Sequence, residues 1–249
     1  MNLIKIIVPA RLSSSRFPGK ALVSIGGTSH LENLLLSIST WMSPANIHVA
    51  TDSVAIDYVV TKAGYTTIRT GPAENGTARI AIAADSLDLH ENDWVLNIQG
   101  DLISVSPEMG LSLLTTLKDA DDVGANWVTF ADEKIWEPGE VGSNSGSVWV
   151  EVDGSSRGIM FGREVNPRTS ATNCKFHSHI GLYAYKPAIL RQYIDLEITQ
   201  NEKDHSLEQF RLLDAGLQPF VGLLSSVPIE INTENDYVQA LLKHTEAVE

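Results

Sequence analysis

The sequence changes character within one stretch near the N-terminus, Ile6-Ile7-Val8-Pro9-Ala10-Arg11-Leu12-Ser13-Ser14-Ser15-Arg16-Phe17-Pro18-Gly19-Lys20-Ala21-Leu22. The apolar, mostly β-branched run from Ile4 to Val8 predicts a buried strand. Pro9 ends this strand, because proline has no N–H to give to a β-ladder. The three cations that follow lie among small, flexible residues. A loop of this kind suits a polyphosphate, since backbone N–H groups and cationic side chains can both face the anion.

The charge of the chain is reversed in this region. The whole sequence carries 18 basic and 31 acidic residues, yet four cations and no acid precede Glu32. The net charge of −13 argues against non-specific binding of nucleic acid, so we expect no such partner. The charge pattern alone leaves open a basic surface loop without a ligand. The loop is not a Walker A motif, because Ala21 follows Gly19-Lys20, and no G-x-G-x-x-G follows the strand.

A length of 249 residues allows one α/β domain or two small ones, and the composition is ordinary for a soluble globular protein. We predict a single α/β domain spanning residues 1–249. Hydrophobic residues make up 43% of the chain, and no apolar run approaches the roughly 18 residues of a membrane span. We therefore expect no membrane partner. Cys174 is the single cysteine, which excludes an internal disulfide and fits a reducing compartment. The N-terminus lacks a signal-peptide pattern, so a cytoplasmic location is expected.

Apolar periodicity in the first half predicts alternating strands and helices. After the first strand we expect a helix capped by Thr28 or Ser29, then strand 46–50, helix 54–63, strand 65–69, a helix from Thr77 and strand 94–98. This order is typical of a parallel, doubly wound sheet with helices on both faces, a three-layer αβα fold.

The second half predicts an antiparallel insertion at about residues 131–175. Acidic, Gly-rich residues 131–146 are expected to be mobile, and Asp153-Gly154 predicts a hairpin between strands 147–152 and 158–163. Further expected elements are helix 107–117, strand 123–130, strand 176–185, helix 187–194, a polar loop at 197–205, helix 206–213 and strand 219–224. His177 and His179 share a face by period two, but no Cys or acid partner at ligand spacing supports zinc.

Two loops contain candidate ligand-binding groups. Asp101 follows strand 94–98 directly, and open α/β sheets bind ligands beyond the carboxyl ends of their strands. A carboxylate beside a triphosphate is a natural Mg²⁺ ligand, although Asp101 can also be a plain turn residue. The turn Asn75-Gly76-Thr77 opens a helix, where it can present N–H groups to an acceptor or act as a simple N-cap.

These motifs, with several downstream, resemble those of the sugar-acid cytidylyltransferase family, in particular its 3-deoxy-manno-octulosonate (Kdo) branch. The matching segments, in the order of the family, are Pro9-Ala10-Arg11 with Ser15-Arg16 and Pro18-Gly19-Lys20-x-Leu22, Asn75-Gly76-Thr77-x-Arg79, Gln99-Gly100-Asp101, Phe161-Gly162-Arg163, His179-Ile180-Gly181-Leu182-Tyr183, Leu207-Glu208-Gln209-Phe210-Arg211 and Asn232-Thr233 with Asp236. The similarity extends from Ile6 to about Ala240.

The resemblance implies a Rossmann-like fold and transfer of CMP from CTP to the anomeric hydroxyl of a 3-deoxy-2-ulosonic acid, with Mg²⁺ as cofactor. It implies a homodimer, built partly by the insertion, which also closes over the sugar, and a place in lipopolysaccharide biosynthesis. The implied nucleotide-binding residues are Pro9, Ala10, Arg11, Arg16, Lys20, Asn75, Gly76, Thr77 and Arg79. The implied catalytic residues are Arg16, Lys20 and Asp101, the metal ligands Asp101 and Asn232, and the sugar-binding residues Gln99, Arg163, His179 and Glu208. The resemblance gives Arg211 only a structural role. From spacing alone, Arg211 and Glu208 are i,i+3 neighbours that could simply pair on the surface.

The chain departs from the family pattern at four positions. Asn75 replaces a Ser, Leu102 follows Asp101 where the family has Glu, Gly162 replaces a Ser, and Asn232 replaces an Asp that ligates metal. Asn232 can coordinate Mg²⁺ but brings no charge, so metal affinity should fall. Two alternatives follow: the same chemistry on a modified sugar acid such as 8-amino-Kdo, or a nucleotide-binding relative that has lost turnover and serves a regulatory role.

Overall fold

The computed structural model describes residues 2–14, 16–136, 148–163 and 173–246. The chain forms two compact units, one made of residues 1–111 and 228–249 and the other of residues 112–227. The predicted single domain of 1–249 stays a prediction, and the part of the expected mobile segment from 137 onward lies outside the described residues. No helix in the described ranges is long and apolar enough to cross a membrane.

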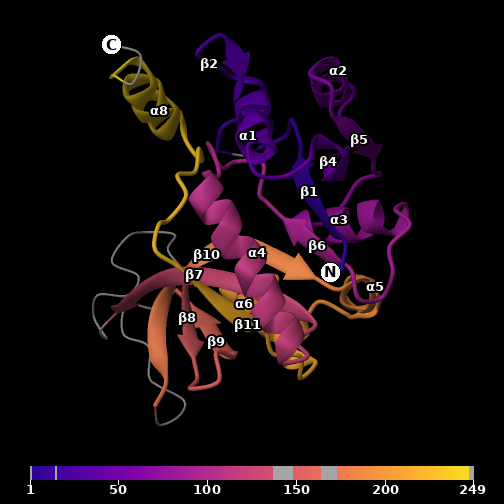
Figure 1. The fold of residues 1–249 in the computed structure, drawn as a ribbon, viewed down its shortest axis with the longest axis vertical. Helices are drawn as coiled ribbons and strands as arrows, with labels where there is room; N and C mark the ends of the chain where they lie inside the picture. The colour runs from indigo at the N-terminus through magenta and orange to yellow at the C-terminus, as the bar shows by residue number, and fades with distance from the viewer. Residues whose placement is uncertain (1, 15, 137–147, 164–172, 247–249) are drawn as a thin grey trace. The chain divides into compact units, whose positions relative to one another are not determined.

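The first unit is built on four parallel strands (Figure 1). The strands β1 (Ile4–Ala10), β4 (Ile47–Thr51), β5 (Thr66–Arg69) and β6 (Trp94–Asn97) lie in the order β6-β1-β4-β5. Residues Ile6 to Val8 and all of β6 are buried, as expected for strands covered on both faces. The parallel sheet predicted from the alternating pattern is therefore confirmed in this unit.

Strand order also places the helices on both faces of this sheet. The connections through α1 (His30–Ser39) and α2 (Val54–Lys62) run in one direction, from β1 to β4 to β5. The connection through α3 (Gly76–Asp85) returns past β1 to β6. Because such crossovers are right-handed, reversal of direction puts α3 on the opposite face. The reversal between β1 and β6 creates the crevice where doubly wound folds bind ligands.

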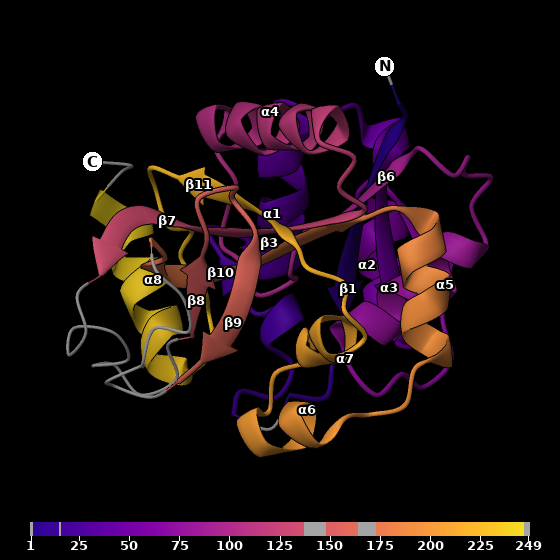
Figure 2. The same cartoon turned by 90° about the horizontal axis from the view of Figure 1, so that it is seen from below.

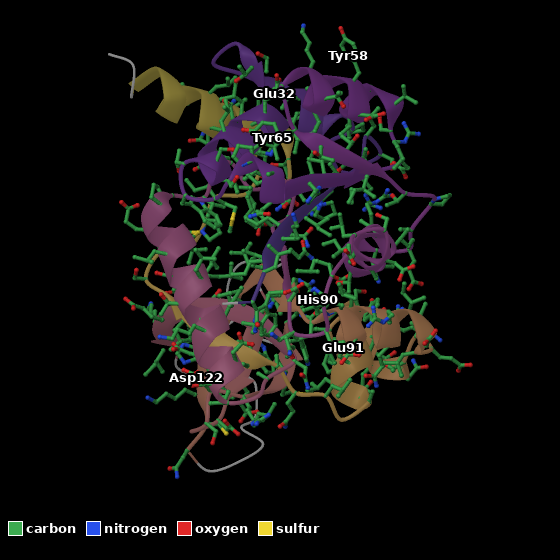
Figure 3. All side chains as sticks on the ribbon, turned by 45° about the vertical axis from the view of Figure 1, so that its right-hand side comes forward. Glu32, Tyr58, Tyr65, His90, Glu91 and Asp122 are labelled. Carbon is green, nitrogen blue, oxygen red and sulfur yellow. The ribbon has the colours of Figure 1, made fainter. Side chains whose placement is uncertain are left out.

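Local capping explains where the helices of this unit begin. Ser29 and Glu32 form a reciprocal capping box at α1, as the sequence predicted for one of two candidate caps. Ser53 caps α2, whose Tyr58 is 67% exposed on its outer surface (Figure 3). Gly64 follows α2 with φ of 88°, the left-handed conformation of a C-terminal glycine. Short elements η1 (Lys20–Leu22), β2 (Ser24–Ile25), β3 (Thr28–Ser29) and η2 (Pro44–Asn46) complete the loops.

The C-terminal segment of the chain returns to this first unit. Helix α8 (Glu234–Glu246) is capped by Thr233, whose hydroxyl accepts from the Asp236 N–H. Buried Ile231 and Ala240 pack with Phe17 of the cationic loop and with Ile25. This packing brings residues near 230 to the end of β1, although more than 200 positions separate them in sequence.

The second unit contains the antiparallel part of the fold. Its strands β7 (Trp127–Trp136), β8 (Trp149–Val152), β9 (Gly158–Gly162), β10 (Lys175–Tyr185) and β11 (Phe220–Leu224) lie in the order β11-β7-β10-β8-β9. Only the β11–β7 pair is parallel among these described strands. Strands β8 and β9 form the predicted hairpin (Figure 2), whose Asp153 carboxylate accepts from the N–H groups of Ser155 and Arg157.

Four helical segments belong wholly or mostly to this unit: α4 (Pro107–Asp122), α5 (Pro187–Asp195), α6 (Gln200–His205) and α7 (Phe210–Asp214). Leu207 and Phe210 pack against Phe161 of β9 and Val150 of β8 in one apolar cluster. The turn between α6 and α7 is therefore held against the hairpin.

Four local predictions were wrong. Pro9 does not end the first strand, because β1 continues to Ala10, with Pro9 opposite Ala50 and Ala10 opposite Thr51 of β4. Pairing of β1 with β6 stops at Ile7, so the N–H that proline lacks is not needed on that side. The expected polar loop at 197–205 contains α6, because Thr199 caps a helix with its side chain. The expected helix at 206–213 is reduced to α7, since Ser206 is left-handed with φ of 52° and ends α6. The strand expected at 123–130 begins only at Trp127, because α4 continues to Asp122 and Gly124 ends it with φ of 68°. The same strand extends to Trp136, so residues 131–136 are not part of a mobile loop.

Candidate active site

The cationic loop is closed at its base by backbone geometry. The Gly19 N–H donates to the Leu12 carbonyl at 2.9 Å, and Gly19 has φ of 75°, which favours glycine. Phe17 is buried, whereas Arg11 and Arg16, which precede it, are exposed. The loop is thus anchored by one aromatic side chain, while its two arginines stay accessible to solvent.

Asp101 comes close to this loop because of the glycine that precedes it. A Cβ atom on Gly100 would lie 2.6 Å from the Pro9 carbonyl oxygen, so only glycine permits this approach of the loops after β1 and β6. The Lys20 ammonium group then reaches three oxygens: Asp101 Oδ2 at 3.0 Å, the Ile231 carbonyl at 2.9 Å and Asn232 Oδ1 at 3.4 Å. One cation is therefore held in a cage of oxygen atoms contributed by two distant segments.

Asn232 lies at the centre of the charged groups. Its Oδ1 accepts from Arg16 Nη2 at 2.9 Å as well as from Lys20, and its Nδ2 donates to Glu230 Oε2 at 2.8 Å. Glu230 is exposed as a residue, but desolvation of its carboxyl group and the nearby Asp101 carboxylate raise its pKa. The amide thus links two cations to a carboxylate that the sequence analysis did not assign to the site.

The opposite wall of the site is the start of α3. Asn75 Oδ1 accepts from the Ala78 N–H at 2.8 Å, so this oxygen acts as the helix cap that the sequence left as one alternative. Arg79 is 4% exposed, and its guanidinium donates to Asp52 Oδ2 at 2.8 Å and to Thr70 Oγ1 at 2.6 Å. These bonds make Arg79 a brace between α3 and the ends of β4 and β5.

These elements surround one pocket within the first unit. Ten residues predicted to act on nucleotide, sugar or metal line it together: Pro9, Ala10, Arg11, Arg16, Lys20, Asn75, Gly76, Arg79, Gln99 and Asp101. Thr77 is 1% exposed and is not among the lining residues, nor is Asn232, which contacts the pocket through Arg16 and Lys20. The lining residues that sequence reasoning did not single out are Ser13, Ser14, Ala21, Ala73 and Gly100. All except Ala73 lie within or beside the quoted motifs.

A buried histidine lies near the charges of Asp101 and Lys20. His30 is in the first turn of α1 and is fully buried. Burial lowers its pKa to about 4, although the Asp101 carboxylate acts in the opposite direction. His30 is therefore neutral at pH 7. No sequence motif marked it, because only the tertiary packing places α1 behind residues 100 and 101.

Three of the four predicted sugar-binding residues, Arg163, His179 and Glu208, lie in the second unit, whereas Gln99 lines the pocket of the first. Arg163 Nε donates to the His205 carbonyl at 3.4 Å, at the end of α6, and Glu208 follows in the turn to α7. His179 Nε2 bonds to Thr129 Oγ1 at 2.8 Å, and its ring meets Phe161 edge-on at 5.3 Å between centroids. Burial, and secondly the charge of Arg163, lower the pKa of His179 to about 3, so the ring is neutral at pH 7.

The neighbouring His177 has a structural role. It is 2% exposed, and its Nδ1 bonds to the Asp132 carbonyl of β7 at 2.8 Å. Among the described residues no group of three or more His, Cys, Asp or Glu side chains could hold a metal ion.

Comparison with known proteins assigns the family. Residues 5–220 match the family model described as cytidylyltransferase. This chain belongs to the cytidylyltransferase family. It is similar to proteins of Rickettsia felis and Rickettsia bellii named 3-deoxy-manno-octulosonate cytidylyltransferase, each 31% identical over 241 residues, which are 96% of this chain and 94% of the relative.

A solved structure gives the same result for the fold. The structure of CMP:2-keto-3-deoxy-manno-octonic acid synthetase complexed with CTP is 25% identical, with a TM-score of 0.86 over 99% of this chain and 100% of the other. The family resemblance and the Rossmann-like α/β fold predicted from the sequence are both confirmed. The roles of individual site residues remain predictions.

Proposed function

We propose that this cytidylyltransferase transfers CMP from CTP to the anomeric hydroxyl of a 3-deoxy-2-ulosonic acid, Kdo or a close analogue, and releases pyrophosphate. The observation that carries the proposal is the pocket at the ends of β1 and β6, where a cationic loop, a helix N-terminus and Asp101 converge. The related proteins are named for this reaction on Kdo, and the similar solved structure is described as a complex with CTP.

The pocket supplies the groups that an in-line displacement on phosphorus needs. Arg11, Arg16 and Lys20 neutralise the triphosphate, and Arg16 and Lys20 stabilise the pyrophosphate as it leaves. The start of α3, at Asn75 and Gly76, offers backbone N–H groups and the positive end of the helix dipole to the nucleotide. Catalysis then consists of positioning and charge neutralisation, without a covalent intermediate on the enzyme.

The oxygen atoms around Lys20 are of the kinds that bind a hard divalent cation. The ammonium group already lies among a carboxylate, a backbone carbonyl and an amide oxygen, which are the ligand types that Mg²⁺ prefers. We propose that Asp101 and Asn232 hold Mg²⁺ when CTP supplies the remaining oxygens. When bound, the ion polarises the α-phosphate and lowers the pKa of the attacking hydroxyl.

We assign recognition of the sugar acid to Gln99, Arg163, His179 and Glu208. A guanidinium such as that of Arg163 can bind a carboxylate with two parallel hydrogen bonds. His179, neutral at pH 7, contributes hydrogen bonding without charge, and Glu208 accepts from sugar hydroxyls. A cytoplasmic homodimer belongs to the same proposal and is tested by light scattering after size-exclusion chromatography.

The deciding experiment measures pyrophosphate release from CTP with Mg²⁺ and a panel of ulosonic acids that includes Kdo and 8-amino-Kdo. Release that depends on one sugar establishes the reaction and identifies the substrate. Lys20→Ala should lower kcat by about 10²–10³-fold, because it removes a cation beside the leaving group. Lys62→Ala, at an exposed position in the last turn of α2, is the matched control and should leave the rate unchanged.

Two results would redirect the proposal. CTP binding without pyrophosphate release, for every sugar tested, would support the nucleotide-binding relative that has lost turnover. Wild-type rates in Lys20→Ala would contradict the phosphate role of the loop.

A further inference from the structure

Of the two proposed metal ligands, Asp101 and Asn232, only Asp101 carries a negative charge. Asn232 accepts hydrogen bonds from two cations, Arg16 and Lys20, with a neutral oxygen. Lys20 pairs with the Asp101 carboxylate at 3.0 Å. A divalent cation at Asp101 would therefore meet one carboxylate and one uncharged amide from these two positions, which is a weak protein contribution for Mg²⁺.

A second carboxylate is held on the segment that pairs with Asp101. The Ile231 N–H donates to the Asp101 carbonyl at 2.8 Å, and the Ile103 N–H donates to the Ile229 carbonyl at 2.8 Å. Leu102 and Glu230 form an antiparallel bridge within this short ladder. These backbone hydrogen bonds hold the backbone of Glu230 beside the Asp101 loop.

The side chain of Glu230 is joined to Asn232 directly. Asn232 Nδ2 donates to Glu230 Oε2 at 2.8 Å, while the Oδ1 of the same amide faces Arg16 and Lys20. The four charged groups form a compact set of two cations and two carboxylates around a neutral amide. When CTP draws the two cations to its phosphates, both carboxylates are left beside the cage that Lys20 occupied.

We propose that Glu230 is the second carboxylate of the metal site and supplies the negative charge that Asn232 lacks. This inference rests on the proposed function, because the triphosphate displaces Lys20 and completes the coordination of Mg²⁺. Asn232 then contributes an oxygen ligand, and Glu230 contributes charge from two residues earlier in the chain.

The test is Mn²⁺ binding, measured by electron paramagnetic resonance in the presence of a CTP analogue with a methylene bridge between the α- and β-phosphates. Glu230→Gln retains an oxygen that can accept from Asn232 Nδ2, so it removes the charge without removing the hydrogen bond. The expected result is a 10- to 100-fold loss of Mn²⁺ affinity. Glu234→Gln, an exposed acid in the first turn of α8, makes the same change of net charge nearby and should bind Mn²⁺ like wild type.

A double variant separates charge from geometry. Glu230→Gln combined with Asn232→Asp moves the carboxylate to position 232, and Mn²⁺ affinity should return to within about threefold of wild type. Unchanged affinity in Glu230→Gln, or failure of the double variant to recover, would overturn the role of Glu230. Nucleotide-dependent Mn²⁺ binding in wild type together with no pyrophosphate release for any sugar would overturn the proposed function but leave the role of Glu230 standing. Absence of Mn²⁺ binding in wild type would overturn both.

Discussion

A buried ion pair in the second unit should be the strongest single polar contribution to the α6–α7 turn. Arg211 donates to Glu202 through two hydrogen bonds, Nε to Oε2 at 2.8 Å and Nη2 to Oε1 at 2.6 Å. The two side chains are only 3% and 11% exposed, and the guanidinium lies 4.4 Å from the ring centroid of Tyr193. The perturbation that tests this pair is Glu202→Leu, Arg211→Met and the two substitutions together.

How deeply each side chain of the pair is buried determines how much its substitution should lower the free energy of unfolding. Glu202→Leu leaves a guanidinium buried without this carboxylate, so the free energy of unfolding should fall by about 3–5 kcal/mol. Arg211→Met should cost somewhat less, about 2–4 kcal/mol, because the carboxylate of Glu202 is nearer to water. The double variant replaces the pair by apolar side chains and should cost no more than either single variant. The coupling energy in the cycle is the sum of the two single costs minus the cost of the double variant, so it should be at least as large as the Glu202→Leu cost, about 3–5 kcal/mol.

The assay is urea unfolding followed by circular dichroism, with hydrogen exchange of residues 198–214 as a local readout. The matched control is Arg69→Ala, which breaks an ion pair with Asp57 at 3.7 Å between side chains that are 45% and 33% exposed. That variant should cost no more than about 1 kcal/mol. A loss below 1 kcal/mol in Glu202→Leu, or additive costs in the double variant, would refute the reasoning.

Because Glu208 lies between the two helices, Glu202→Leu should also raise the KM for the sugar acid more than that for CTP.

Three further outcomes are expected. Gly100→Ala should lower the free energy of unfolding by about 1–3 kcal/mol and weaken CTP binding in calorimetry, because its Cβ would overlap the Pro9 carbonyl. Gly154→Ala is the control: its Cβ would meet no atom within 4 Å, so stability and CTP binding should stay unchanged. Equal effects of the two substitutions would contradict the close-approach argument. Arg79→Met should lower CTP affinity at least 10-fold in calorimetry by removing the brace of the pocket wall, and an unchanged Kd would contradict this role. The folded structure lowers the pKa of His179 from 6.5 to about 3, so as the pH falls the unfolded chain binds a proton at this residue before the folded protein does. Lowering the pH from 7 to 5 should therefore reduce the free energy of unfolding by roughly 2 kcal/mol through His179. In urea unfolding, the stability of His179→Gln should depend less on pH than that of wild type, and parallel pH profiles would contradict this.

Local patterns in the sequence predicted most strands and helices of the fold. Apolar runs bounded by Pro, Gly and capping residues are local signals, and β4, α2, β5, α3 and β6 begin or end within two residues of their expected positions. Predictions failed where one residue overrode the average character of a segment. Thr199 started a helix within a polar stretch, and Ser206 ended it in a left-handed conformation that polarity does not encode.

The sequence by itself determined the family, the cationic loop after the first strand and the carboxylate after β6, because each is a contiguous motif. Only the tertiary structure decided which of these groups meet. The pairing of residues 229–231 with 101–103 brings Glu230 to the site from more than 100 positions away, and no local pattern specifies that pairing. Likewise, Arg79 binds Asp52 and Thr70 because α3 packs across the ends of two strands. Contacts between distant segments depend on how whole elements pack, and a linear motif carries no information on that packing.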